Sequence, residues 1–258
     1  MRDVMLSVLF PRGVRCILCG EARKMDGKNA LCRKCRDRLW DTRIPAASCE
    51  RCKSYVEAGG VCRFCKNGGM EHIVSTYAPF MYTGAARTLV MQLKFRDMDD
   101  GLTYLTDAMA GALPIRDFDL IVPVPLHANR ERQRGCNQAQ LLAQGVGARI
   151  RVPVGSTLKR IRATSPQSTL ASLRARRSNV ENAFALCGDA DVSGKKILLV
   201  DDVRTSGSTA RACAKVLLQG GAKEVHLLCA CVVWHYKGNE KNGSVAGKNG
   251  AAAGQHGR

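Results

Sequence analysis

Four pairs of cysteines place the strongest constraint on how this chain folds. Each pair has the form Cys-x-x-Cys, and all four lie within fifty residues near the N-terminus. Two such pairs supply the four thiolates of one tetrahedral zinc site. We therefore predict a small module that structural zinc, one or two ions, holds together. Its ligands are Cys16, Cys19, Cys32, Cys35, Cys49, Cys52, Cys62 and Cys65.

The spacing leaves the pairing of these cysteines open. In the simplest arrangement the first two pairs bind one ion and the last two bind a second, and an interleaved arrangement is the alternative. Disulfides are disfavoured, since no secretion signal is visible and a reducing cytosol opposes them. A site with four cysteine ligands has no open position for a substrate, so its role is structural.

The charge of the chain indicates a polyanionic partner. The formal net charge is +18, divided as +8 over residues 1–66, +7 over 67–236 and +3 over 237–258. Because no single tail supplies the charge, a basic surface spread over the protein is expected. Nucleic acid is the first candidate partner and an acidic membrane surface the second.

No segment of the sequence is long enough to span a membrane. The apolar run Val4–Phe10 ends at Pro11, well short of the ~20 residues that a spanning helix needs. Arg12 follows it where a signal peptide has a small-residue cleavage site. We expect a short amphipathic helix here that packs on the body of the protein, and a cytoplasmic location.

The central part of the chain alternates apolar strands with helical segments. Such alternation predicts an α/β fold with a mostly parallel sheet and flanking helices. The predicted strands are Asp119–Leu126, Lys195–Asp202 and Glu224–Val233, and the predicted helices are Asn137–Ile150 and Ser208–Ala222. Three parts follow: 1–68 with the N-terminal helix and the cysteine module, 69–236 as the α/β domain, and 237–258 as a disordered tail rich in Gly and Ala.

Two adjacent carboxylates end one of the predicted strands. Asp201 and Asp202 are followed by a loop of small hydroxyl residues around a glycine, and then by a helix. Hydroxyls and a helix N-terminus suit a phosphate, whereas paired carboxylates suit vicinal hydroxyls or Mg²⁺. A ribose 5-phosphate has both groups. The loop consists of Thr205, Ser206, Gly207, Ser208 and Thr209.

The motif LLVDDVRTSGST resembles the phosphoribosyl-pyrophosphate (PRPP) motif of type I phosphoribosyltransferases. With VPVPLHANRERQRGCNQAQLLA, RATSPQSTLASLRARRSNVENAF and the cysteine-rich head, the chain is similar to the ComF family from about Leu9 to Val233. The resemblance implies a double zinc ribbon before a type I phosphoribosyltransferase-like domain. It also implies a part in bacterial competence, the uptake of single-stranded DNA, beside other competence proteins in the cytoplasm. Cys136 and Ser206 depart from the family pattern, where phenylalanine and threonine are common.

The same resemblance assigns roles to the site residues. Asp201 and Asp202 are the candidate catalytic pair and bind the ribose hydroxyls of PRPP, with Mg²⁺ as the expected companion of that ligand. Residues 205–209 wrap the 5-phosphate. Arg130 and Arg134 follow another strand end and are expected to contact the pyrophosphate, because guanidinium groups suit phosphate oxygens.

A second basic group lies between the two site strands. Residues 151–180 hold seven positive charges and no acid, where type I transferases have a flexible hood. This hood closes on pyrophosphate, grips a nucleic-acid backbone, or does both. The candidate nucleic-acid contacts are Arg160, Arg162, Arg174, Arg176 and Arg177. Base stacking falls to Trp40, Tyr55 and Phe64, although core packing is the expected role of each.

Two functions fit this sequence. In the first, a competence protein binds PRPP and assists the handling of incoming single-stranded DNA. In the alternative, a phosphoribosyltransferase of nucleotide metabolism acts on an unidentified small acceptor. No dedicated general base is visible, but such transferases rely largely on positioning and on stabilising the developing charge, so its absence decides little between the two functions.

Overall fold

A computed structural model describes residues 15–21, 31–56, 59–93, 99–162, 180, 182–188 and 190–234 of the chain. Several predictions concern residues outside these ranges. They are the helix at Val4–Phe10, the tail at 237–258, and the nucleic-acid contacts Arg174, Arg176 and Arg177.

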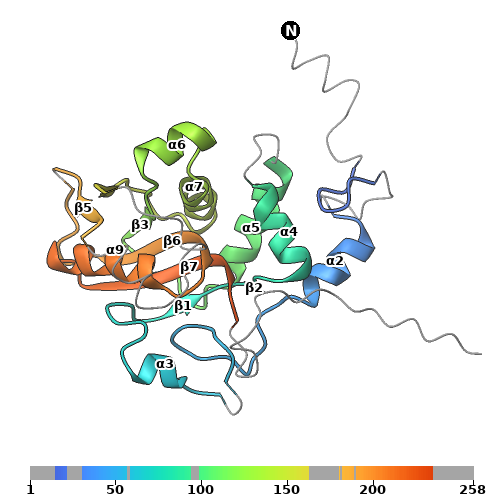
Figure 1. Cartoon of the computed structure of the whole chain (residues 1–258), viewed down its shortest axis with the longest axis horizontal. Helices are drawn as coiled ribbons and strands as arrows, with labels where there is room; N and C mark the ends of the chain where they lie inside the picture. The colour runs from blue at the N-terminus through green and yellow to red at the C-terminus, as the bar shows by residue number, and fades with distance from the viewer. Residues whose placement is uncertain are drawn as a thin grey trace, which may run out of the picture.

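A parallel sheet of five strands forms the centre of the protein (Figure 1). Its order is β1-β7-β6-β3, and β2 also pairs with β7. All of the pairings in this sheet are parallel, as the alternation of strands and helices predicts. The strands are β1 (Thr76–Tyr77), β2 (Phe80–Met81), β3 (Leu120–Pro123), β6 (Lys196–Arg204) and β7 (Glu224–Val232).

Strand β6 is buried on both of its faces. Ile197 and Leu199 belong to one core cluster, whereas Leu198 and Val200 belong to the other. Side chains of a strand alternate between the faces of the sheet, so a run of four apolar residues requires cover on both sides. The apolar run therefore reflects a position between β3 and β7, where both faces carry other elements.

Helices cover the two faces of this sheet. Helices α4 (Gly84–Gln92), α5 (Asp99–Gly111) and α7 (Gln138–Ile150) contribute to the cluster of Leu198, and α9 (Ser208–Gln219) contributes to that of Leu199. The predicted helices α7 and α9 are confirmed. Among the residues that the structure describes, no helix has both the length and the apolar character needed to cross a bilayer.

A smaller antiparallel sheet stands apart from the main one. It pairs β4 (Leu158–Arg160), which lies within the predicted hood segment 151–180, with β5 (Phe184–Leu186), which follows that segment. Helix α6 (Ala128–Arg134) follows the carboxyl end of β3. Arg160 at the end of β4 lies close enough to Asp201 for its charge to affect the pKa of that carboxyl.

The two halves of the cysteine module pack in different cores. The first half contains α2 (Arg33–Trp40), and its cysteines share a cluster with Leu89 of α4. The second half contains α3 (Arg63–Lys66), and its cysteines share the other cluster with α9. Figure 1 shows α2 beside α4 and α3 well away from it, below the sheet.

Candidate functional site

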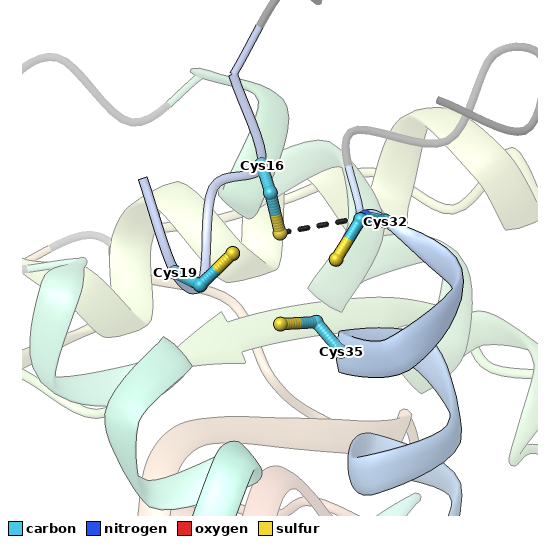
Figure 2. Close-up of side chains that lie close together, drawn as sticks. All are labelled: Cys16, Cys19, Cys32 and Cys35. Carbon is cyan, nitrogen blue, oxygen red and sulfur yellow. Dashed lines mark hydrogen bonds between the residues drawn. The ribbon is translucent and has the colours of Figure 1, made fainter. Parts of the chain in front are cut away.

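The first cysteine cluster gathers four sulfur atoms around one point. The Sγ atoms of Cys16, Cys19, Cys32 and Cys35 all lie within 4.8 Å of one another. Figure 2 shows the four side chains turned toward a common centre, with the backbone N–H of Cys32 donating to Sγ of Cys16 at 3.4 Å. Such N–H groups stabilise negative charge on a thiolate.

The second cluster repeats this arrangement. The Sγ atoms of Cys49, Cys52, Cys62 and Cys65 are also within 4.8 Å of one another, and those of Cys52 and Cys62 are 3.6 Å apart. Zn–S bonds of ~2.3 Å in a tetrahedron separate the sulfurs by roughly 3.8 Å, so both clusters fit a zinc ion. The sequential pairing of the cysteines is the one that the structure adopts.

The two clusters are built on the same turn. The N–H of Cys16 donates to the carbonyl of Glu21 at 3.0 Å, and that of Cys49 donates to the carbonyl of Ser54 at 2.7 Å. Four residues after each of these cysteines, Gly20 and Lys53 have positive φ values of 72° and 56°. The second turn therefore holds a lysine in a conformation that favours glycine.

Charge in the second cluster is stabilised by its surroundings. A hydrogen bond with Cys65 lowers the pKa of Cys52 to about 4, against the effect of burial, and Ser54 and the charge of Arg204 act in the same direction. A thiol that ionises this readily is a ready ligand for a divalent cation.

The acid pair lies where β6 runs past the end of β3. Val200 is the last residue of β6 paired with β3, so Asp201 and Asp202 adjoin an open edge. Burial first, and then the carboxylate of Asp202, raise the pKa of Asp201 well above its usual value. The charge of Arg160 partly offsets this shift. The pair therefore forms a half-buried carboxyl site at the end of a central strand, where a second negative charge is disfavoured.

The loop after the acids holds a compact group of hydroxyls. Ser206 and Ser208 are buried, with their Oγ atoms 2.9 Å apart, and Thr205 and Thr209 are half-buried. Gly207 between them has a φ of 77° and is the N-cap of α9 without a side-chain cap bond, while the N–H of Ser208 donates to Oγ of Ser206 at 3.4 Å. Uncapped N–H groups at a helix N-terminus attract a phosphate.

The loop is tied to the second cysteine cluster. Arg204 is only 3 % exposed, and its Nη2 donates to the carbonyl of Cys52 at 2.7 Å and to Oγ of Ser54 at 3.0 Å. Its Nη1 donates to the carbonyl of Thr205 at 2.9 Å. A Cβ atom on Gly207 would lie 2.6 Å from Sδ of the buried Met70.

Predicted basic contacts fall in different places. Arg130 and Arg134 lie in α6, directly after β3, and only their backbone belongs to the described part of the chain. Arg162 is exposed. Arg160 is half-buried, with its guanidinium 5.3 Å from the centre of the Phe184 ring and near enough to Asp201 to affect its pKa. This position gives Arg160 a second candidate role beside the acid pair.

The aromatic residues of the cysteine module also differ from one another. Tyr55 packs near Trp234, with ring centres 5.6 Å apart, and Phe64 packs against the second core cluster. Core packing is confirmed for Phe64, whereas Tyr55 is half-buried and its ring contacts Trp234. Core packing is wrong for Trp40, which is 62 % exposed and carries the Arg43 guanidinium 3.7 Å from its ring centre.

Sequence reasoning missed the residues that join the loop to the cysteine module. Arg204 lies inside the quoted motif, but its partner Cys52 is 152 residues away. Met70 follows the last cysteine pair and carries no signal of a role in the loop. The one available clue was an arginine flanked by apolar and small residues at a strand end.

Solved structures give only a weak comparison. An allosteric regulatory enzyme of purine biosynthesis is 19% identical over 54% of this chain and 30% of that one, with a TM-score of 0.37. A purine phosphoribosyltransferase from Pyrococcus horikoshii is 14% identical over 56% of this chain and 91% of that one, with a TM-score of 0.31. At these TM-scores neither likeness carries an argument.

Sequence relatives are more informative. Competence protein F of Haemophilus influenzae is 37% identical over 111 residues, which cover 42% of this chain and 48% of the relative. Competence protein ComFC of Streptococcus pneumoniae is 27% identical over 229 residues, which cover 82% of this chain and 97% of the relative. The DNA utilization protein YhgH of Escherichia coli K12 is 41% identical, and the match spans 49% of it.

Two family models match the chain, and one relative settles the family. The double zinc ribbon domain matches residues 5–66, and the phosphoribosyl transferase domain matches residues 138–249. The DNA utilization protein YhgH of Salmonella typhi is 37% identical over 160 residues, which cover 58% of this chain and 68% of the relative. The chain therefore belongs to the ComF family, with a double zinc ribbon followed by a phosphoribosyltransferase domain.

Proposed function

We propose that this protein binds PRPP with Mg²⁺ and assists the handling of single-stranded DNA during competence, in the cytoplasm. The observation that carries the proposal is the acid pair at the carboxyl end of β6, followed at once by a hydroxyl loop and an uncapped helix N-terminus. Acids for the ribose hydroxyls and N–H groups for the 5-phosphate stand in the order that PRPP requires.

Mg²⁺ fits the acid pair on chemical grounds. Carboxylate oxygens are hard ligands of the kind that Mg²⁺ prefers, and PRPP itself offers phosphate oxygens. Burial, and after it the repulsion between the two adjacent carboxylates, raises the pKa of Asp201. Asp201 and Asp202 would hold such a cation, which would supply positive charge beside the carboxylates and the phosphate oxygens of the ligand.

A basic surface on the first zinc ribbon supports a role with single-stranded DNA. Helix α2 turns Cys35 and Leu39 inward, and the rest of its residues face outward to different degrees. Exposed Trp40 lies at its end, stacked by Arg43. Cations beside an exposed indole bind a phosphate backbone and stack a base. The basic residues of this surface are Arg33, Lys34, Arg36, Arg38 and Arg43.

The first experiment is titration calorimetry of PRPP with Mg²⁺ into the zinc-loaded chain, with and without a short single-stranded oligonucleotide. We expect PRPP to bind, and we expect the Asp201→Asn, Asp202→Asn double variant to lose that binding. Asp191→Asn is the matched control, since Asp191 is an exposed acid paired with Lys195.

The binding of PRPP and the binding of single-stranded DNA can be contradicted separately. Absence of PRPP binding in the intact protein contradicts the pocket. Oligonucleotide binding that does not weaken between low and high salt contradicts the electrostatic surface. Turnover of PRPP by a small nucleophile in the absence of DNA favours the transferase of nucleotide metabolism instead.

A further inference from the structure

Arg204 connects the second zinc ribbon, which is expected to bind a metal, with the hydroxyl loop, which is expected to bind a phosphate. One end of its guanidinium is held by the knuckle of the second zinc ribbon, through the Cys52 carbonyl and the Ser54 hydroxyl. The other end is held by the carbonyl of Thr205, the first residue of the hydroxyl loop. A planar guanidinium with fixed donors transmits position between its partners better than a flexible ammonium does.

Burial makes this connection costly to break. Arg204 is almost fully covered, and a buried charge requires partners for its donors or a charge of opposite sign. Four thiolates around one Zn²⁺ have a net charge of −2. This negative charge stabilises a neighbouring buried guanidinium. Removal of the metal or of the arginine leaves the other without this partner.

The segment after the second ribbon also supports the loop directly. Met70 is fully buried and packs so closely on Gly207 that a Cβ atom there would lie 2.6 Å from its sulfur. Glu71, next in the chain, accepts a hydrogen bond from Nη2 of Arg211 in α9 at 2.9 Å. The ribbon and the start of α9 thus form one packed unit.

The first ribbon provides an internal contrast. Its cysteines pack in the cluster of α4 and α5, whereas those of the second ribbon share a cluster with Ala210 and Cys213 of α9. In the part of the chain that the structure describes, the hydrogen bonds that Arg204 donates to a zinc knuckle go to the second ribbon.

We propose that the second zinc ribbon supports the hydroxyl loop, residues 205–209. Arg204 is the positioning residue that couples zinc binding in this ribbon to ligand binding at the loop. This inference rests on the proposed binding of PRPP for its ligand half. Coupling between two sites is reciprocal, so PRPP retains zinc in the second ribbon to the same degree that zinc favours PRPP.

Zinc release tests the coupling without any ligand. The full zinc-loaded chain is mixed with a chromogenic chelator, and a Cys19→Ser variant identifies which phase of release belongs to the first ribbon. We expect Arg204→Gln to accelerate the second-ribbon phase roughly tenfold, as for the loss of one hydrogen bond to a charged group. The first-ribbon phase stays unchanged. Arg211→Gln is the control, since it removes an arginine contact to Glu71, which lies after the second ribbon and outside its zinc knuckle.

PRPP then tests the reciprocal effect. In the wild type, PRPP with Mg²⁺ is expected to slow release from the second ribbon and not from the first, and Arg204→Gln is expected to remove this protection and to weaken PRPP binding about tenfold. Arg204→Lys restores zinc retention only in part, because an ammonium lacks the fork.

Three outcomes overturn the inference. They are an unchanged second-ribbon phase in a folded Arg204→Gln protein, equal protection of both ribbons by PRPP, and an Arg211→Gln effect as large as that of Arg204→Gln. The wild-type comparison with and without PRPP needs no variant, so it decides the matter if Arg204→Gln does not fold. Failure of PRPP to bind the wild type contradicts the proposed function, while the zinc-release comparison still tests the role of Arg204.

Discussion

Asp202 donates its backbone N–H to Oδ1 of Asp201 at 2.9 Å, and the Asp202 carboxylate in turn raises the pKa of Asp201 after the larger effect of burial. The same neighbour thus both holds the Asp201 side chain in place and opposes its charge. A cation or a hydroxyl-bearing ligand that binds here relieves this repulsion, so the site favours such ligands.

Replacement of Asp201 by Asn is expected to stabilise the free protein at high pH. A raised pKa means that the folded state holds the proton more tightly than the unfolded state, so wild-type stability declines as pH rises through that pKa. Asp201→Asn lacks this decline. Thermal unfolding of the two zinc-loaded proteins, followed as pH rises above the ordinary aspartate pKa of 3.8, measures the difference, at about 2–4 °C for each kcal/mol. A parallel decline in both proteins contradicts the prediction.

Alanine at position 207 is expected to damage the loop. Gly207 has a φ of 77°, and an added Cβ atom meets the sulfur of buried Met70. The left-handed conformation alone costs ~1–2 kcal/mol, so we expect a larger loss of unfolding free energy and a loss of PRPP binding. Urea unfolding and calorimetry measure the two. Gly188→Ala is the control, because nothing lies within 4 Å of its added Cβ, and an equal loss there contradicts the argument.

Loss of the exposed indole is expected to weaken DNA binding without affecting the fold. Trp40 is 62 % exposed, so Trp40→Ala leaves the core intact. At ~1–3 kcal/mol per stacked base, the affinity for a single-stranded oligonucleotide falls about five- to 150-fold. Fluorescence anisotropy measures the change. Val74→Ala, at 45 % exposure, is the matched control, and equal affinities of the two variants contradict the prediction.

Two zinc ions are expected in each chain. Both clusters have four sulfurs within bonding reach of one ion, and the cysteines of each are packed into a core of the α/β domain. Chelation is therefore expected to lower the unfolding temperature of the whole protein, beyond the loss of a separate head. Metal analysis and calorimetric unfolding check this. One ion per chain, or an unfolding transition of the α/β domain unaffected by chelation, contradicts it.

The central strands follow from the sequence, and their ends do not. Strand β6 was predicted to end at Asp202, but it continues to Arg204 because Val203 and Arg204 still pair with β7. Strand β3 was predicted to reach Leu126 and stops at Pro123, since Pro125 has no N–H for a ladder. Local composition identifies a strand, whereas its partner decides its length.

Contacts between distant segments lie beyond a single sequence for a different reason. The cysteine spacing predicts the zinc ligands because each pair is local, and the motif around Asp201 is continuous in the chain. The bond from Arg204 to Cys52 joins segments whose separation carries no periodic signal. The exposure of Trp40 was missed for the same reason, because the packing of α2 against α4 decides which side of that helix is buried.

The positions of the two ribbons also bear on biosynthesis. The ribosome makes the chain from its N-terminus, so both sets of four cysteines are complete before the residues of β6 and β7 have been added. One ribbon then borders each core of the sheet that those strands complete. We therefore expect the nascent chain to require metal before the α/β domain can form. None of these eight cysteines belongs to that domain itself.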